Sequence, residues 1–250
     1  MSYNQRVKRR ATPLLDRNPR EVFREADSWA AVVDGLRHVK IPDDSKIWIL
    51  AVGSTAPLLA AIRERGFDGL RSTGVHGDVA SFSYRRRYGR GAKKTISGDF
   101  VIAASQHDDV HLVAFVGRRA FLRHGITPLL DRLYPRVARP FLTQSELHGA
   151  LRSIQRAVKP DALRIQEYSA KRRLRSSSKK FESLRNWTDA DLDVSFREAA
   201  ERNVWFQSVR FVVARDGGDR SPWRGMHALI SKYGLVSFDG GVDLVGRRIV

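Results

Sequence analysis

The sequence predicts an α+β fold made of mixed, mainly antiparallel β layers with a helical middle segment. Hydrophobic residues make up 42% of the 250 residues, which is enough for a core and excludes a globally disordered chain. Apolar segments of strand length occur in both halves, separated by short turns. Residues 118–158 show helical spacing instead, interrupted at Gly125, Pro135 and Pro140.

The first predicted element is a helix over residues 18–39. Asn18 is a suitable N-cap, Pro19 suits the first helical position, and Glu21 gives a pattern similar to a capping box. The helix should end before Pro42. Its apolar residues recur at spacings of three and four, which indicates one buried face: Val22, Ala26, Trp29, Val33 and Leu36.

A βα unit follows, with a strand over residues 46–52 and a helix over residues 56–65 closed by Gly66. The small residues 53–55 between them could hold a phosphate at a helix N-terminus. They lack the glycine patterns of known phosphate loops, so a simple connection is the better interpretation.

Three β-rich segments come next, at residues 79–87, 94–105 and 110–116. Phe82 and Tyr84 alternate with serines, as expected of a half-buried strand. Short turns between the segments favour antiparallel hairpins. The tip of the first hairpin is then predicted between Arg87 and Lys94.

The second half is predicted to be β-rich with one helix. Before it, Thr143 and Glu146 match a capping box that opens the last helix of the middle segment. Residues 188–191 cap a further helix that runs to Arg202. Strands are predicted at residues 162–170, 204–214, 226–230 and 235–238, the last two as a hairpin, with a turn at residues 216–219.

These elements divide the chain into three parts. Residues 1–17 form a basic arm that we expect to be flexible. No apolar signal core follows its charges, so we do not interpret it as a secretion signal. Residues 18–158 form an N-terminal α+β domain, and residues 159–250 form a C-terminal α+β domain. The two domains can also pack as one unit.

The charge of the chain points to a polyanionic partner. Lysine and arginine number 45 against 27 acidic residues, for a formal net charge of +18. Such an excess creates a positive field that attracts a phosphate backbone. RNA and DNA remain open as alternatives, because a contact to the 2′-hydroxyl leaves no signature in composition.

Two basic blocks, at residues 84–94 and 171–180, are the candidate contact sites. In the first, glycines permit sharp bends and a tyrosine could stack on a base. In the second, a serine triplet accompanies the cations, and we expect this segment to be flexible when free. Solvated basic loops are the alternative interpretation. The candidate nucleic-acid-binding residues are Tyr84, Arg85, Arg86, Arg87, Tyr88, Arg90, Lys93, Lys94, Lys171, Arg172, Arg173, Arg175, Lys179 and Lys180.

Trp187 lies close behind the second block. It could form a stacking platform for bases, but packing at the start of the following helix is the simpler interpretation.

The sequence assigns no metal, cofactor or catalytic residue. The chain has no cysteine, which rules out disulfides and thiolate metal sites and is compatible with the cytoplasm. His107, Asp108, Asp109 and His111 contain metal-ligand types, but they fall in a predicted turn where aspartate is common anyway. No apolar run is long enough to span a membrane, and the interrupted basic blocks do not favour a membrane surface.

The sequence thus predicts a nucleic-acid-binding protein that grips the phosphate backbone through two cationic loops. Such a protein can act alone or as a subunit of a larger nucleoprotein assembly. The alternative is a metal-dependent nuclease or another enzyme acting on nucleic acid, although no spacing of carboxylates assembles such a site.

Overall fold

A computed structural model gives the fold. It describes residues 17–36, 38–39, 41–42, 44–55, 57–105, 107, 109–158, 163–173, 181–213 and 226–239. Apart from Arg17, the basic arm lies outside the described residues, as does the turn expected at residues 216–219.

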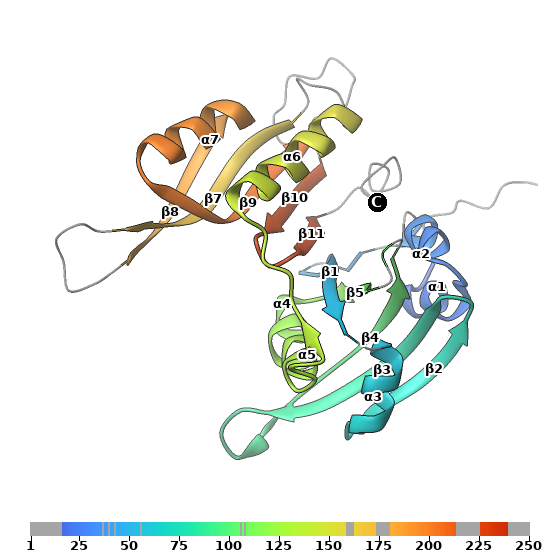
Figure 1. The fold of residues 1–250 in the computed structure, drawn as a ribbon. Helices are drawn as coiled ribbons and strands as arrows, with labels where there is room; N and C mark the ends of the chain where they lie inside the picture. Colours follow the sequence, from blue (N-terminus) through green and yellow to red (C-terminus); the bar gives the residue numbers. More distant parts are fainter. Residues whose placement is uncertain are drawn as a thin grey trace, which may run out of the picture.

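One antiparallel sheet of eleven strands runs through the described residues, which confirms the α+β prediction (Figure 1). The short strand β6 (Val137–Ala138) pairs with β1 beside the main path. Along that path the strands lie in the order β2 (Leu70–His76), β3 (Val79–Tyr88), β4 (Lys94–Ala104), β5 (Val110–Gly117), β1 (Lys46–Ser54), β11 (Leu235–Asp239), β10 (Met226–Ser231), β9 (Val204–Val213), β7 (Leu163–Arg173) and β8 (Phe181–Ala190).

The pairing of β1 with β11 joins the two halves of the chain. β1 pairs with β5 on one side and with β11 on the other, and Ile47 lies opposite Phe238. The side chains of β1 alternate between the two faces of the sheet. Ile47 packs in one hydrophobic core, whereas Trp48 and Leu50 pack in a second.

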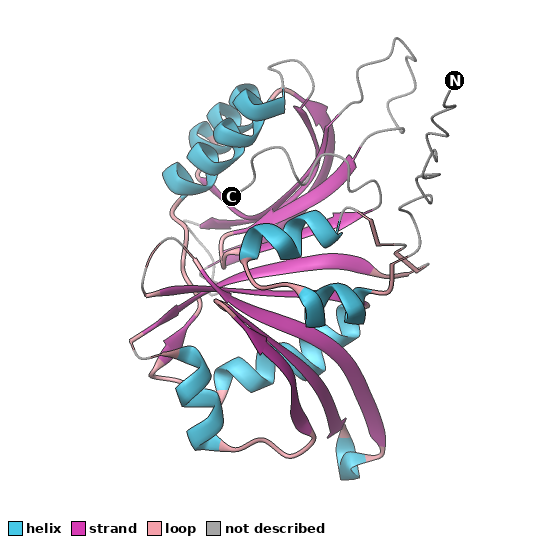
Figure 2. Ribbon diagram, turned by 90° about the vertical axis from the view of Figure 1, so that its right-hand side faces the viewer, coloured by secondary structure: helices cyan, strands magenta, loops and turns pink. Residues whose placement is uncertain are grey.

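The helices cover these two faces unequally. The first core lies under α1 (Pro19–Glu25), α2 (Trp29–Leu36), α6 (Gln144–Val158) and α7 (Leu192–Glu201), and it extends across both halves of the sheet. The second core lies under α3 (Leu58–Arg65), α4 (Arg119–Phe121), the π-helical segment η2 (Leu122–Ile126) and α5 (Thr127–Asp131). In Figure 2, helices flank the strands on both sides in the lower half of the molecule.

Several elements differ from the sequence prediction; among them, residues 188–190 belong to β8, so that Asp191 alone caps α7. The helix expected over residues 18–39 breaks after α1, because Ala26 is extended and the Ser28 hydroxyl accepts from the Ala31 amide to start α2. The strand β2 was not predicted, since its side chains are mostly exposed and polar. Its hydrogen bonds to β3, rather than burial, hold it in the sheet.

The predicted capping box is confirmed at the start of α6. The Thr143 amide donates to the Glu146 carboxylate at 2.7 Å, and the Glu146 amide donates to the Thr143 hydroxyl at 3.2 Å. The carboxylate of Glu146 also accepts from the Thr143 hydroxyl at 2.8 Å, and the bonds that it accepts from the Thr143 amide and hydroxyl lower its pKa. In this way the cap fixes where α6 begins.

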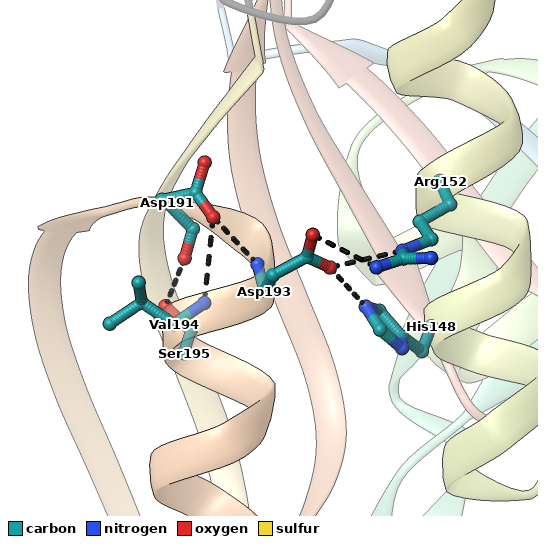
Figure 3. A network of polar contacts seen from close by, with 6 residues as sticks. All are labelled: His148, Arg152, Asp191, Asp193, Val194 and Ser195. Atoms are coloured by element: carbon teal, nitrogen blue, oxygen red, sulfur yellow. Dashed lines mark hydrogen bonds and ion pairs between the residues drawn. The ribbon is translucent and has the colours of Figure 1, made fainter.

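A polar network ties α6 to α7 (Figure 3). His148 and Arg152, one turn apart on α6, both bond the Asp193 carboxylate, His148 at 2.9 Å and Arg152 at 3.0 and 2.9 Å. Asp191 caps α7 by accepting from the Asp193 amide at 2.8 Å. The hydrogen bond from His148, followed by the bond and charge of Arg152, lowers the pKa of Asp193.

We predict that Asp193→Asn destabilises the protein at neutral pH by less than about 1 kcal/mol, because the network is solvent-exposed and screened. Since the pKa of Asp193 is lowered by folding, the wild-type advantage is complete above about pH 4. It disappears as the pH falls through the pKa of the folded protein. Chemical denaturation across a pH series measures this, with Glu198→Gln, an exposed acid of α7, as the charge-matched control.

We predict that Phe238→Ala destabilises the protein by about 3–5 kcal/mol, because it leaves a cavity at the junction of the halves. Phe238 is 1% exposed and belongs to the core shared by both halves. Equilibrium unfolding in urea measures the loss. The exposed Tyr134→Ala should stay within about 0.5 kcal/mol of wild type. Equal stabilities for the two variants would contradict the joining role of β11.

Candidate nucleic-acid interface

The first basic block forms the end of the long β3–β4 hairpin, as predicted. The pairing runs from Val79–Ala103 to Tyr88–Lys94, so the tip comprises residues 89–93. Gly89 and Gly91 have φ values of +84° and +66°, which glycine adopts without strain. The tip extends beyond the neighbouring helices at the lower left of Figure 1.

Five cations of this hairpin are exposed: Arg85, Arg87, Arg90, Lys93 and Lys94. Within the described part of the chain, none of them takes part in an ion pair. Arg85 and Arg87 are two residues apart in β3 and therefore share one face of the strand. These side chains are available to an external anion.

Arg86 and Tyr88 point to the other face, where they contact η2. The Arg86 guanidinium donates to the His124 carbonyl oxygen at 2.8 Å, and the Tyr88 ring stacks on the His124 ring at 4.2 Å. Both side chains thus anchor the base of the hairpin to the fold. One face of the Tyr88 ring is covered by His124, which leaves at most the other face for a base.

Tyr84 cannot stack on a nucleic-acid base. The prediction that it is a nucleic-acid-binding residue, made together with Tyr88, is therefore wrong for Tyr84. Its side chain is 2% exposed and packs in the second core. Burial raises the pKa of its hydroxyl.

An open pocket of about 480 Å³ lies beside the hairpin. Four arginines contribute to its wall, against one carboxylate, so the pocket favours an anion. Its lining consists of Asp68, Gly69, Tyr84, Arg85, Arg86, Arg87 and Arg132.

Of the second basic block, the structure describes residues 171–173, which end β7. Lys171 is exposed on β7, whereas Arg172 bonds the Glu182 carboxylate at 2.7 Å. Arg173 is the last residue of β7 and pairs with Phe181. Arg175, Lys179 and Lys180 lie outside the described residues.

Three exposed aromatic side chains lie near this block. The sequence analysis did not single out Phe181 and Trp205, and it favoured a different role for Trp187. Trp187 is 67% exposed on β8, so the simpler interpretation, packing at the start of a helix, is wrong. Phe181 and Trp205 are 52% and 39% exposed. The apolar residues of β8, Phe181, Leu184 and Trp187, recur at every third position, so the sequence shows no strand-like alternation and β8 was not predicted.

The other candidate sites provide little chemistry. Gly53 and Ser54 belong to β1, and the Ser54 and Thr55 amides donate to carbonyl oxygens, which confirms a simple connection. Burial lowers the pKa of His111. The described residues contain no group of three or more His, Asp or Glu side chains placed to hold a metal ion. None of the described helices is long and apolar enough to cross a membrane.

Comparison with known proteins gives no family. No family model, no curated protein and no solved structure matches this chain. Any function must therefore be argued from the site itself.

We predict that Arg86→Ala lowers stability by about 1–2 kcal/mol, because the His124 carbonyl oxygen loses a charged donor. Arg87→Ala, one residue away and exposed, should change stability by less than about 0.5 kcal/mol. Thermal or urea unfolding of the two variants measures the difference. A neutral Arg86→Ala would show that this contact does not anchor the hairpin.

Proposed function

We propose that the protein binds nucleic acid by gripping its phosphate backbone through the cationic ends of two hairpins, β3–β4 and β7–β8. The observation that carries the proposal is the set of five exposed hairpin cations without an ion-pair partner among the described residues. Five such cations close together on one hairpin concentrate positive charge, and arginine and lysine side chains are the usual contacts to phosphates.

The arrangement of the hairpins supports this proposal. The β3–β4 tip and the described ends of β7 and β8 extend toward the same side of the molecule in Figure 1. The net charge of +18 attracts a polyanion over a longer range than either hairpin alone. Contacts of this kind fix the backbone of the nucleic acid without reading its sequence.

RNA and DNA are both compatible with this geometry, and the protein acts either alone or as the nucleic-acid-binding subunit of a larger assembly. We place the activity in the cytoplasm, with which a chain free of cysteine is compatible. The nuclease alternative has no supporting observation in the described residues.

The test is a salt series of binding to labelled RNA and DNA, using Arg85→Ala/Arg87→Ala/Arg90→Ala. Arg86 is left intact because it supports the fold. We expect affinity at low salt to fall more than tenfold. The slope of log K against log salt should become shallower by about 2–3, because each lost phosphate contact contributes roughly 0.7–0.9.

The matched control is Arg24→Ala/Arg63→Ala/Arg197→Ala, which removes the same charge from exposed positions on α1, α3 and α7. It tests whether net charge alone accounts for the loss. Equal losses in the two triple variants would contradict a specific role of the hairpin. Absence of binding by the wild type at low salt would overturn the proposal itself.

A further inference from the structure

The sheet has one face that no described helix covers. α6 and α7 pack on one side of β7 and β9, through Leu147, Leu192 and the other members of the first core. The opposite face of β7, β8 and β9 continues the face that α3, α4 and α5 cover in the N-terminal half. We call the uncovered part, made by the side chains of these three strands that point away from α6 and α7, the open face.

The register shows which side chains share the open face, since directly paired residues of antiparallel strands point the same way. They form three consecutive rows across β8, β7 and β9. The rows are Ser183–Lys171–Trp205, Arg185–Ser169–Ser208 and Trp187–Glu167–Arg210.

Aromatic rings stand at opposite corners of these rows. Trp187 and Trp205 are separated by two rows along the strands and two strands across the sheet, or about 16 Å. Phe181, at the start of β8, lies edge-on to Trp205 with ring centroids 6.5 Å apart. Exposed aromatic groups of this size are costly in water and mark a binding surface.

The side chains that lie between the aromatic rings on the open face include three short, polar ones, all serines. The Ser169 and Ser208 hydroxyls bond each other at 2.8 Å, and Ser183 is exposed. Short side chains here leave the space above the sheet open, so that flat groups can enter between the rings.

Cations border the same space in fixed positions. Glu167 is 6% exposed and ion-pairs with both Arg185 and Arg210. The Arg185 guanidinium also lies 5.5 Å from the centre of the Trp187 ring. Lys171 lies on the same face, so that Lys171, Arg185 and Arg210 together outnumber the single carboxylate of Glu167. The carboxylate orients two of the cations, and the surface retains a net positive charge.

This combination favours one kind of occupant. Separated rings suit unstacked bases, and the cations between them suit the phosphates that link those bases. A duplex keeps its bases stacked inside and can use only the cations. We propose that the open face binds single-stranded nucleic acid, with bases stacked on Trp187, Trp205 and Phe181 and phosphates held by Lys171, Arg185 and Arg210.

This inference rests on the proposed function but goes further, because phosphate contact by the hairpins does not distinguish one strand from two. The open face makes single strands the preferred substrate. It also adds a stacking contribution that salt does not remove.

The test compares Trp187→Ala/Trp205→Ala with wild type on a labelled oligothymidylate and on a duplex of the same length. Alanine substitution at a stacking residue costs about 1–3 kcal/mol per base. We therefore expect single-strand affinity to fall at least tenfold with an unchanged salt slope, and duplex affinity to change less than about twofold. Trp187→Phe/Trp205→Phe should restore most of the loss.

Tyr134→Ala, which removes a 74% exposed ring elsewhere, is the matched control and should leave both affinities unchanged. A second readout is the quenching of tryptophan fluorescence by the oligothymidylate, which should shrink in the phenylalanine variant because that variant retains only Trp29, Trp48 and Trp223. Circular dichroism and thermal unfolding confirm that the variants fold.

The outcomes separate the two proposals. If the wild type binds neither probe, the proposed function fails. If the wild type binds but the tryptophan variant loses nothing, or loses both probes equally, only the stacking platform is overturned. Binding of polyglutamate as tightly as oligothymidylate would also overturn it, because that polymer offers charge without rings.

Discussion

The central strand β1 is the constraint on which the rest of the structure depends. It carries the pairing between the two halves of the described sheet, because it pairs with β5 on one side and with β11 on the other. Its alternating side chains must therefore supply two cores at once, Ile47 to one and Trp48 to the other. Both halves are consequently positioned by the register of this one strand.

The unequal covering of the two faces follows from this arrangement. One core extends beneath helices from both halves, whereas the other is covered only in the N-terminal half. A sheet face without a helix must be polar or must bind something. The open face is polar around three exposed aromatic rings, which serines and cations surround.

Arginines on the two candidate surfaces differ in role according to what they contact. Arg86 is bound to a backbone carbonyl and holds the hairpin to η2, while its neighbours Arg85 and Arg87 extend into solvent. On the open face, Glu167 orients Arg185 and Arg210 without cancelling their combined charge. Fixed cations of this kind bind an anion at a lower entropic cost than freely rotating side chains.

The sequence by itself determined the local elements and the charge. The cap at Thr143 and Glu146 and the basic tip between Arg87 and Lys94 were predictable, because capping and hairpin formation depend on neighbouring residues. Only the tertiary structure decided that Arg86, and not Arg85 or Arg87, anchors the hairpin to η2. It also decided that Tyr84 is buried. It also placed Trp187, Lys171 and Trp205 on one face. Those properties arise from strand register and from contacts between residues up to 40 or so positions apart, which local patterns do not encode.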